Sequence, residues 1–146
     1  MRELIVEIAK DFDYDSNLLS FNSDNTLTVE SRKHFVRQVD WCYCSQFDLP
    51  IDFIREFKDE VNWEWVSFCQ KLSEDFIREC QDEVDWCGIS EGQDLSEEFI
   101  REFKDKVDWY YIYKYKNLSE DFITEFRSEI NWRYIDDPEF VDKFKV

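Results

Sequence analysis

The sequence is poor in the residues on which many catalytic and ligand-binding sites depend. It contains two glycines, two prolines and one histidine among 146 residues, and its five cysteines form no C-x-x-C pair. Two glycines do not make a phosphate-binding loop, and Cys42 with Cys44 is too sparse for a zinc site. A Cys-His nucleophile using His34 is conceivable, but a helix histidine is the simpler interpretation. We therefore expect a protein that is not an enzyme and needs neither a cofactor nor a metal.

Long apolar runs are also missing. No stretch approaches the length needed to span a membrane, and the start, MRELIVEIAKDFD, is too acidic and too briefly apolar for a signal peptide. The cysteines are odd in number and irregularly spaced, which is typical of free thiols or small buried side chains in a reducing compartment. We expect an intracellular protein that is not bound to a membrane.

Positive charge is scarce, and the formal net charge is -17. The acidity is uneven: residues 72–94 carry -7 and residues 118–140 carry -5, whereas residues 95–117 are neutral. A disordered acidic tail lacks aromatic residues, yet 18% of this chain is aromatic, so we expect it to fold. Direct binding to nucleic acid or to an anionic membrane is disfavoured because both need a cationic surface. A protein partner with a basic surface is the natural complement.

The dominant feature that is present is an internal repeat. The tryptophans Trp63, Trp86, Trp109 and Trp132 are spaced 23 residues apart, and Trp41 precedes the first by 22. Each tryptophan stands fourteen positions after a leucine that opens a unit. Three of these leucines are the first residues of the strings LSEDFIREC, LSEEFIREF and LSEDFITEF. The sequence therefore predicts five units, at residues 27–48, 49–71, 72–94, 95–117 and 118–140.

Each unit reads as two helices. Counted from the leucine at position 0, apolar residues at positions 4, 5, 8 and 12 fall on one face of a helix. Ser73, Ser96 and Ser119 stand at an N-cap and Pro50 replaces the serine in its unit, while a second cap (Asn or Asp) directly precedes each tryptophan. We expect a first helix of about eleven residues, a tight corner, and a second helix of about two turns.

One such unit cannot bury enough apolar surface to offset its conformational entropy. Its side chains contribute on the order of 10 to 20 kcal/mol, against an ordering cost of roughly 1.5 kcal/mol per residue. Neighbouring units must therefore cover one another's apolar faces. We predict an all-α fold, a short α-solenoid of about five stacked helix-turn-helix repeats that forms one continuous domain.

The two ends depart from the repeat. Residues 1–26 resemble a degenerate unit that acts as an N-terminal cap, with Leu4, Ile5 and Ile8 at helical spacing. The alternative is a strand over residues 3–8 with a hairpin around residues 22–25. Near the C-terminus Pro138 should end the second helix of the last unit. Residues 139–146 should form a closing turn with Phe140 and Phe144 packed inward, and residues 141–146 are the C-terminal tail.

The run LSEDFIREFKDxVDW at this period resembles an uncharacterised short tandem repeat of giant-virus (mimivirus-like) and phage proteins. The resemblance covers residues 49–140 well and residues 27–48 weakly. It implies a viral origin and a repeat scaffold, so that the compartment would be host cytoplasm and the partner a host factor. Residues 72–94 depart most, because Gly88 and Gly92 should loosen their second helix by about 1 kcal/mol each.

Acidic residues recur at the same places in the first helices. A solvated face explains them most simply. The sharper alternative is that they imitate a phosphate backbone and occupy the cationic groove of a host nucleic-acid-binding or defence enzyme. The candidate residues for this acidic surface are Glu74, Asp75, Glu79, Asp82, Glu83, Glu120 and Asp121.

Aromatic residues on the second helices vary between otherwise matching units. Phenylalanines at positions 4 and 8 and the tryptophan at 14 are expected in the core. A constant framework with a varying aromatic strip is arranged like a binding surface, and we predict a noncatalytic protein-protein interaction scaffold. The alternative is that these aromatics fill the contact between units. The candidates are Tyr43, Trp65, Phe68, Tyr110, Tyr111, Tyr113 and Tyr134.

Overall fold

A computed structural model of the chain describes residues 2–11, 20, 23, 27–38, 40, 49–135 and 138–144. Within these residues the regular structure is helical and includes no β-strand, which confirms the all-α prediction. The chain divides into two compact units, Met1–Gln70 and Lys71–Val146, so that the boundary falls one residue before the end of the predicted repeat 49–71.

The first unit contains α1 (Arg2–Asp11), α2 (Val29–Gln38), α4 (Ile51–Glu56) and α5 (Trp63–Cys69). In α1, Ile5, Ile8 and Ala9 are buried on one helical face, so the alternative of a strand over residues 3–8 is wrong. The segment proposed for a hairpin, apart from Ser23, and the second half of the predicted repeat 27–48 lie outside the described residues.

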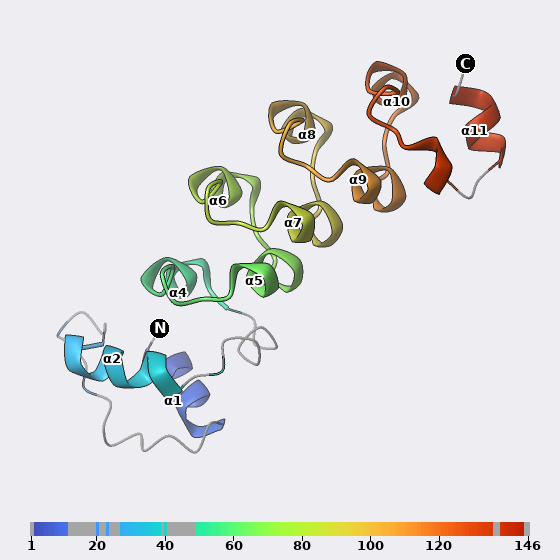
Figure 1. Cartoon of the computed structure of the whole chain (residues 1–146). Coiled ribbons are helices and arrows are strands. Elements are labelled where there is room, and N and C mark those ends of the chain that lie inside the picture. Colours follow the sequence, from blue (N-terminus) through green and yellow to red (C-terminus); the bar gives the residue numbers. More distant parts are fainter. Residues whose placement is uncertain are drawn as a thin grey trace. The chain divides into compact units, whose positions relative to one another are not determined.

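The second unit contains α6 (Glu74–Glu79), α7 (Trp86–Gly92), α8 (Glu97–Glu102), α9 (Trp109–Tyr115) and α10 (Glu120–Glu125). They are followed by the short 3-10 helix η2 (Trp132–Tyr134) and by α11 (Pro138–Phe144). Figure 1 shows α6, α8 and α10 side by side in one row and α7 and α9 in a second row. Each of the repeats 72–94 and 95–117 thus adds one helix to each row.

The predicted caps are confirmed, because each capping side chain accepts a hydrogen bond from the backbone of the helix that it begins. Ser73, Ser96 and Ser119 accept from the N–H of the phenylalanine three residues later. In the second helices, the Asp85 side chain accepts from the Gly88 N–H and the Asp108 side chain accepts from the Tyr110 N–H. Pro50, which precedes the first helix α4, makes no side-chain cap. These local hydrogen bonds fix where each helix starts.

The first helices are shorter than predicted: α4, α6, α8 and α10 each have six residues, not about eleven. The residue at position 8, such as Cys80 with φ -109° and ψ 28°, leaves the helical conformation. The chain then makes another turn, in which the N–H groups of Glu83 and Val84 both donate to the Cys80 carbonyl. Val84 is buried as the periodicity predicts, although it lies beyond the helix end.

The repeated tryptophan binds the turn that follows each of these helices. The indole Nε1 of Trp86 donates to the carbonyl of Gln81, and Trp63 and Trp109 make the same bond to Lys58 and Lys104. In a continuous helix that carbonyl would accept an N–H four residues on. The phenylalanines at position 4 are buried, as predicted. The described tryptophans at position 14 are only half-buried, so the prediction that they belong to the core is wrong.

Adjacent repeats of the second unit are joined by an arginine from one repeat. The guanidinium carbon of Arg101 lies 4.8 Å from the centroid of the Phe122 ring, and its Nε is 3.0 Å from a Glu125 carboxylate oxygen. Arg78 repeats this arrangement one unit earlier, on Phe99 and Glu102. The equivalent residue in the repeat 118–140 is a threonine, Thr124.

A second joint uses glutamates at the start of the first helices. The backbone N–H of Ser119 donates to Glu97 over 2.6 Å, and that of Ser96 donates to Glu74 over 2.7 Å. The hydrogen bond from Ser119 lowers the pKa of the Glu97 carboxyl, with a smaller contribution from Arg101. These glutamates therefore belong to the framework that links one repeat to the next.

The two glycines do not fray α7, which has seven residues like α5 and α9. Gly88 is buried, and among the described helices α7 and α9 make the most extensive close approach of their backbones. The missing side chain permits this approach. The buried Ser90 hydroxyl contributes too, because it accepts the N–H of Asp108 from the next repeat over 2.8 Å.

At the C-terminal end, α11 begins at Pro138 and includes residues expected in the tail. The preceding η2 has three residues, in agreement with the predicted break before the proline. Lys143 on α11 forms an ion pair with Glu120 on α10. Phe144 is half-buried, while the Phe140 side chain lies outside the described part of the structure.

Candidate protein-binding surface

Of the aromatic residues predicted for binding, Trp65, Phe68, Tyr110 and Tyr134 are exposed, whereas Tyr111 and Tyr113 are half-buried. The exposed fractions of the large aromatic residues at the surface are 41% for Trp65, 44% for Phe68, 39% for Tyr110, 50% for Tyr115 and 59% for Tyr134. Trp65 and Phe68 belong to α5 of the first unit, and the three tyrosines belong to the second unit. Tyr43 lies outside the described residues. Exposed large aromatics are the side chains that most often dominate binding energy at protein interfaces.

Tyr113 differs from the others because it packs between repeats. Its ring stacks on Trp109 at 5.6 Å, and its hydroxyl donates to the Phe126 carbonyl of the next repeat over 2.9 Å. Burial raises the pKa of this phenol well above its usual range, with a smaller contribution from Glu129. Tyr113 thus takes part in the contact between units, as the alternative interpretation of the aromatics proposes.

Four tyrosines of the second unit form a surface cluster, called here the tyrosine cluster. Tyr110 meets Tyr111 edge to face at 5.1 Å and Tyr134 at 6.1 Å. Tyr115 stacks on Tyr111 at 5.9 Å, with the two ring planes 13° apart. The cluster joins two adjacent repeats, because Tyr134 comes from η2 and the other members come from α9.

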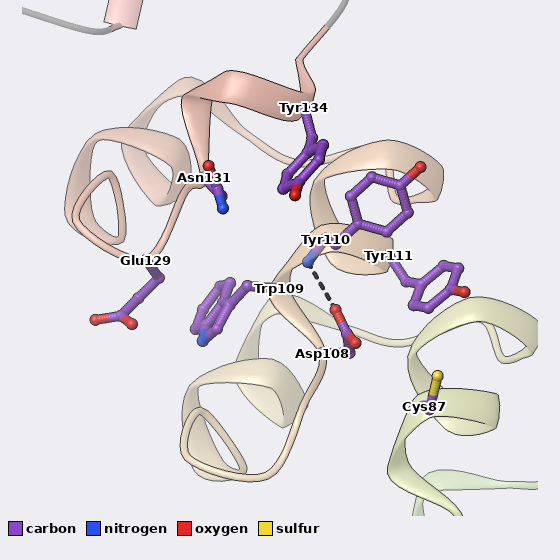
Figure 2. A pocket seen from close by; sticks show the side chains of 8 residues that line it. All are labelled: Cys87, Asp108, Trp109, Tyr110, Tyr111, Glu129, Asn131 and Tyr134. Carbon is purple, nitrogen blue, oxygen red and sulfur yellow. Dashed lines mark hydrogen bonds between the residues drawn. The ribbon is translucent and has the colours of Figure 1, made fainter.

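An open cleft of about 560 Å³ lies at this cluster. This volume is within the usual range for ligand-binding pockets. Figure 2 shows Tyr134 next to Tyr110, with Asp108 placed between Trp109 and Tyr111 in this view. The lining of the cleft combines aromatic rings with carboxylates. It consists of Cys87, Asp108, Trp109, Tyr110, Tyr111, Glu129, Asn131 and Tyr134.

The surroundings of the cleft are anionic. Glu91, followed by Cys87, raises the pKa of the Tyr111 phenol, and Asp108 adds to the effect. Burial raises the pKa of the Cys87 thiol, and the carboxylates of Asp85 and Asp108 raise it further. Since a nearby negative charge opposes loss of a proton, the contributions of Glu91, Asp85 and Asp108 to these shifts reflect carboxylates close to the cleft, while burial is the larger cause for Cys87.

A lysine next to the tyrosine cluster shows that its rings attract a cation. The Lys114 ammonium lies 5.0 Å from the centroid of the Tyr110 ring and 4.9 Å from that of Tyr115. It also donates to the Tyr110 hydroxyl over 2.9 Å. These hydrogen bonds to Tyr110 and Tyr115 raise the Lys114 pKa, so the ammonium is charged at neutral pH.

The predicted acidic residues divide into two groups. Glu74 is half-buried and accepts the Ser96 N–H, so it belongs to the joint between repeats. Asp75 and Asp82 are almost fully exposed, although Arg78 lies 3.2 Å from Asp75 and Lys106 lies 3.5 Å from Asp82. The remaining acidic candidates are also exposed: Glu79, Glu83, Glu120 and Asp121.

The groups most often involved in catalysis are dispersed. His34 is exposed on α2, 3.8 Å from Glu30 of the same helix. Cys69, Cys80 and Cys87 are free thiols, and Cys42 and Cys44 lie outside the described residues. In the part of the chain that the structure describes, no group of three or more potential ligands is placed to hold a metal ion. The described helices also include none that is long and apolar enough to cross a bilayer.

Sequence reasoning missed Tyr115 and two buried glutamines that each close their own repeat. Tyr115 stands four residues after Tyr111 on a helix, a spacing that brings two side chains into contact. The buried amides of Gln70 and Gln93 each accept the N–H of the leucine that opens their own repeat, over 2.9 and 3.0 Å. Their identical position in two units was the available signal.

Comparison of the chain with protein-family models, with curated proteins and with solved structures found no match to any of them. The resemblance to short viral tandem repeats therefore stays a prediction.

Proposed function

We propose that the chain is a noncatalytic α-solenoid of five stacked repeats of about 23 residues, which binds a protein with a basic surface through its second helices. The repeat count rests on the sequence period and, within residues 71–146, on the two rows that α6, α8 and α10 and that α7 and α9 form. If the chain is viral, as the repeat resemblance implies, the partner is a host protein. The first helices then serve as the framework, and the second helices carry recognition.

The observation that carries this proposal is the exposure of large aromatic rings on the second helices. Trp65 and Phe68 on α5 and Tyr110 and Tyr115 on α9 are solvent-exposed, while the phenylalanines of the first helices are buried. Exposing such rings forgoes burial energy in the free protein. A partner that covers them recovers that energy, and the net charge of -17 favours a basic partner.

A second candidate is an acidic mimic of nucleic acid. The side chains of Asp75 and Asp82 are 97% and 88% exposed, in a repeat with a net charge of -7. Such carboxylates could occupy the cationic groove of a nucleic-acid-binding enzyme. Against this stands the pairing of several first-helix glutamates with arginines of the neighbouring repeat, which reduces the anionic field that they present.

The test of the proposal is capture of partner proteins by the full-length chain, compared with two sets of variants. In one set Trp65→Ala is combined with Tyr134→Ala, and in the other Asp75→Asn is combined with Asp82→Asn. For the aromatic scaffold we expect the first set to lose the captured protein while circular dichroism and thermal unfolding are retained. The second set should keep most of it.

The mimic predicts a different pattern. Loss of the captured protein with the Asp75→Asn/Asp82→Asn pair, together with competition by DNA or RNA and release between 50 and 300 mM salt, would support it over the scaffold. Retention of the same protein by the Trp65→Ala/Tyr134→Ala pair contradicts binding through the second helices.

A further inference from the structure

The cleft at the tyrosine cluster has the chemistry of a site for a cationic side chain. Its lining includes the carboxylates of Asp108 and Glu129, the amide of Asn131 and four aromatic rings, and none of its eight lining residues is a lysine or an arginine. The aromatic face is electron-rich and attracts a cation, particularly where water is partly excluded. Aromatic rings that stand beside a carboxylate thus select for positive charge and against anions or purely apolar groups.

The chain already uses this chemistry between its own repeats. Arg78 and Arg101 each place a guanidinium over a phenylalanine ring, at 4.9 and 4.8 Å, with a glutamate within 3.0 Å of the same guanidinium. Within the first unit, Arg32 lies 4.9 Å from the Phe57 ring centroid and pairs with Glu56. A ring next to a carboxylate is therefore occupied by an arginine at three places among the described residues. The cleft presents the same two groups towards solvent, although one of its rings, Tyr110, already has the Lys114 ammonium 5.0 Å from its centroid.

Asp108 is central because its carboxylate has only part of its hydrogen-bonding capacity used within the chain. One oxygen caps α9 by accepting the Tyr110 N–H over 2.9 Å, drawn as the dashed line in Figure 2. A carboxylate has two oxygens and about four acceptor sites, so it can cap the helix and still receive a guanidinium N–H. Tyr134, the most exposed ring of the cluster, lies next to Tyr110 at the same opening.

We propose that this cleft binds an arginine side chain of the partner protein, with the guanidinium lying against the Tyr134 ring, which packs edge to face on Tyr110, and pairing with the Asp108 carboxylate. The inference rests on the proposed protein-binding function and names the partner group that the cleft recognises. A planar guanidinium stacks on rings and donates several hydrogen bonds at once, whereas a lysine ammonium is a more strongly hydrated point charge. Arginine is therefore the occupant that uses both the rings and the carboxylate.

The probe is a heptapeptide of glycine and serine with one central arginine, titrated into the full-length protein and followed by NMR. The matched probe carries citrulline, which has the shape of arginine but no charge. We expect the arginine peptide to shift the resonances of Tyr110 and Tyr134 and to bind about fivefold more tightly than the citrulline peptide. A lysine peptide should fall between them. Equal affinity of the arginine and citrulline peptides, or no saturable shift at millimolar peptide, overturns the proposal.

Two variants locate the site without disturbing the fold. Asp108→Asn removes the charge but keeps a capping side chain, because Asn62 and Asn131 cap the equivalent helices in other repeats. Tyr134→Leu removes an exposed ring. Each should weaken arginine-peptide binding about threefold to tenfold. The controls Glu98→Gln and Trp65→Leu remove an exposed charge and an exposed ring outside the cleft, and should leave the affinity unchanged. Equal effects of the controls and the cleft variants contradict the site.

The same variants separate this inference from the broader function. If a protein captured by the wild type is lost with Trp65→Ala but kept by Asp108→Asn and Tyr134→Leu, the binding function holds and the arginine site is refuted. If the arginine peptide binds the cleft while no captured protein depends on the second-helix aromatics, the arginine site holds and the proposed function is refuted.

Discussion

The repeats at residues 72–94 and 95–117 share a framework but differ in their second helices. Both have a capped first helix with two buried residues. In both, the tryptophan indole donates to the carbonyl five residues before it. The second helix α7 carries two glycines and a buried serine, whereas α9 carries four tyrosines. The first helix therefore meets the same demands in every repeat, while the second is free to differ.

Position 18 shows what this difference does. In α7 it is Ser90, whose hydroxyl accepts a backbone N–H from the next repeat. In α9 it is Tyr113, which reaches further and donates to a carbonyl of the next repeat. Both residues satisfy a polar backbone group of the following unit, one with a short side chain and one with a long one. The small α7 lets α9 approach closely, and the large α9 builds an exposed aromatic surface.

The strongest test of this comparison removes a framework residue. Phe99 is fully buried, contacts Phe103 at 4.7 Å and lies under the Arg78 guanidinium. Phe99→Ala should lower the free energy of unfolding by about 3 to 5 kcal/mol, because it leaves a cavity and removes the arginine's ring. Urea unfolding measures the loss. In the same repeat, Tyr115→Ala, at an exposed ring, should cost less than about 1 kcal/mol. Similar losses for the two variants would remove the distinction between framework and surface.

A glycine pair sharpens the account of α7. Gly88 is buried near the close approach of α9, and Gly92 is exposed at the helix end. Gly92→Ala should raise stability by about 0.5 to 1 kcal/mol, since alanine loses less conformational entropy in a helix. Gly88→Ala should lower stability by about 1 to 3 kcal/mol through overpacking. Thermal unfolding of the two variants gives the signs. A stabilising Gly88→Ala would show that helix propensity, and not close packing, decides at this position.

The smallest effect concerns the joint at Glu97. Its pKa in the folded protein lies below the ordinary value of 4.5, because the ionised carboxylate accepts the Ser119 N–H. A lowered folded pKa contributes stability above pH 4.5, and this contribution is lost as the pH falls through the folded pKa. The difference in unfolding free energy between wild type and Glu97→Gln should therefore shrink as the pH is lowered below this value. Glu98→Gln, on the exposed side of the same helix, is the control, and an equal pH dependence for both would contradict the assignment.

The sequence predicts the fold well where the interactions are local. The N-caps at Ser73, Ser96 and Asp108 connect residues two or three apart, so residue type and spacing identify them. The burial of Phe76 and Ile77 follows from their place on one helical face. The end of the first helix is not predicted, because the apolar periodicity continues to Val84, which is buried although it lies beyond the helix end.

The candidate site is predicted only in part for the same reason. Tyr111 and Tyr134 are named by their variation between repeats and Tyr110 by its place beside Tyr111, and the structure places all three at the cleft. Tyr113 has the same residue type and lies on the same helix, yet it packs between repeats. Which tyrosine is exposed depends on the backbone and side chains of the following repeat, and the spacing within one helix carries no such information.

The amino-acid sequence by itself determined the repeat, the helix starts and the buried positions, because caps and apolar periodicity act over a few residues. Only the tertiary structure decided which carbonyl each tryptophan binds, which glutamate receives each arginine, and which aromatics surround the cleft. The arginine joints connect residues 24 apart, and their geometry depends on how one repeat lies on the next. Contacts of that kind arise from packing between repeats, since the order of residues within a repeat does not fix their distance in space.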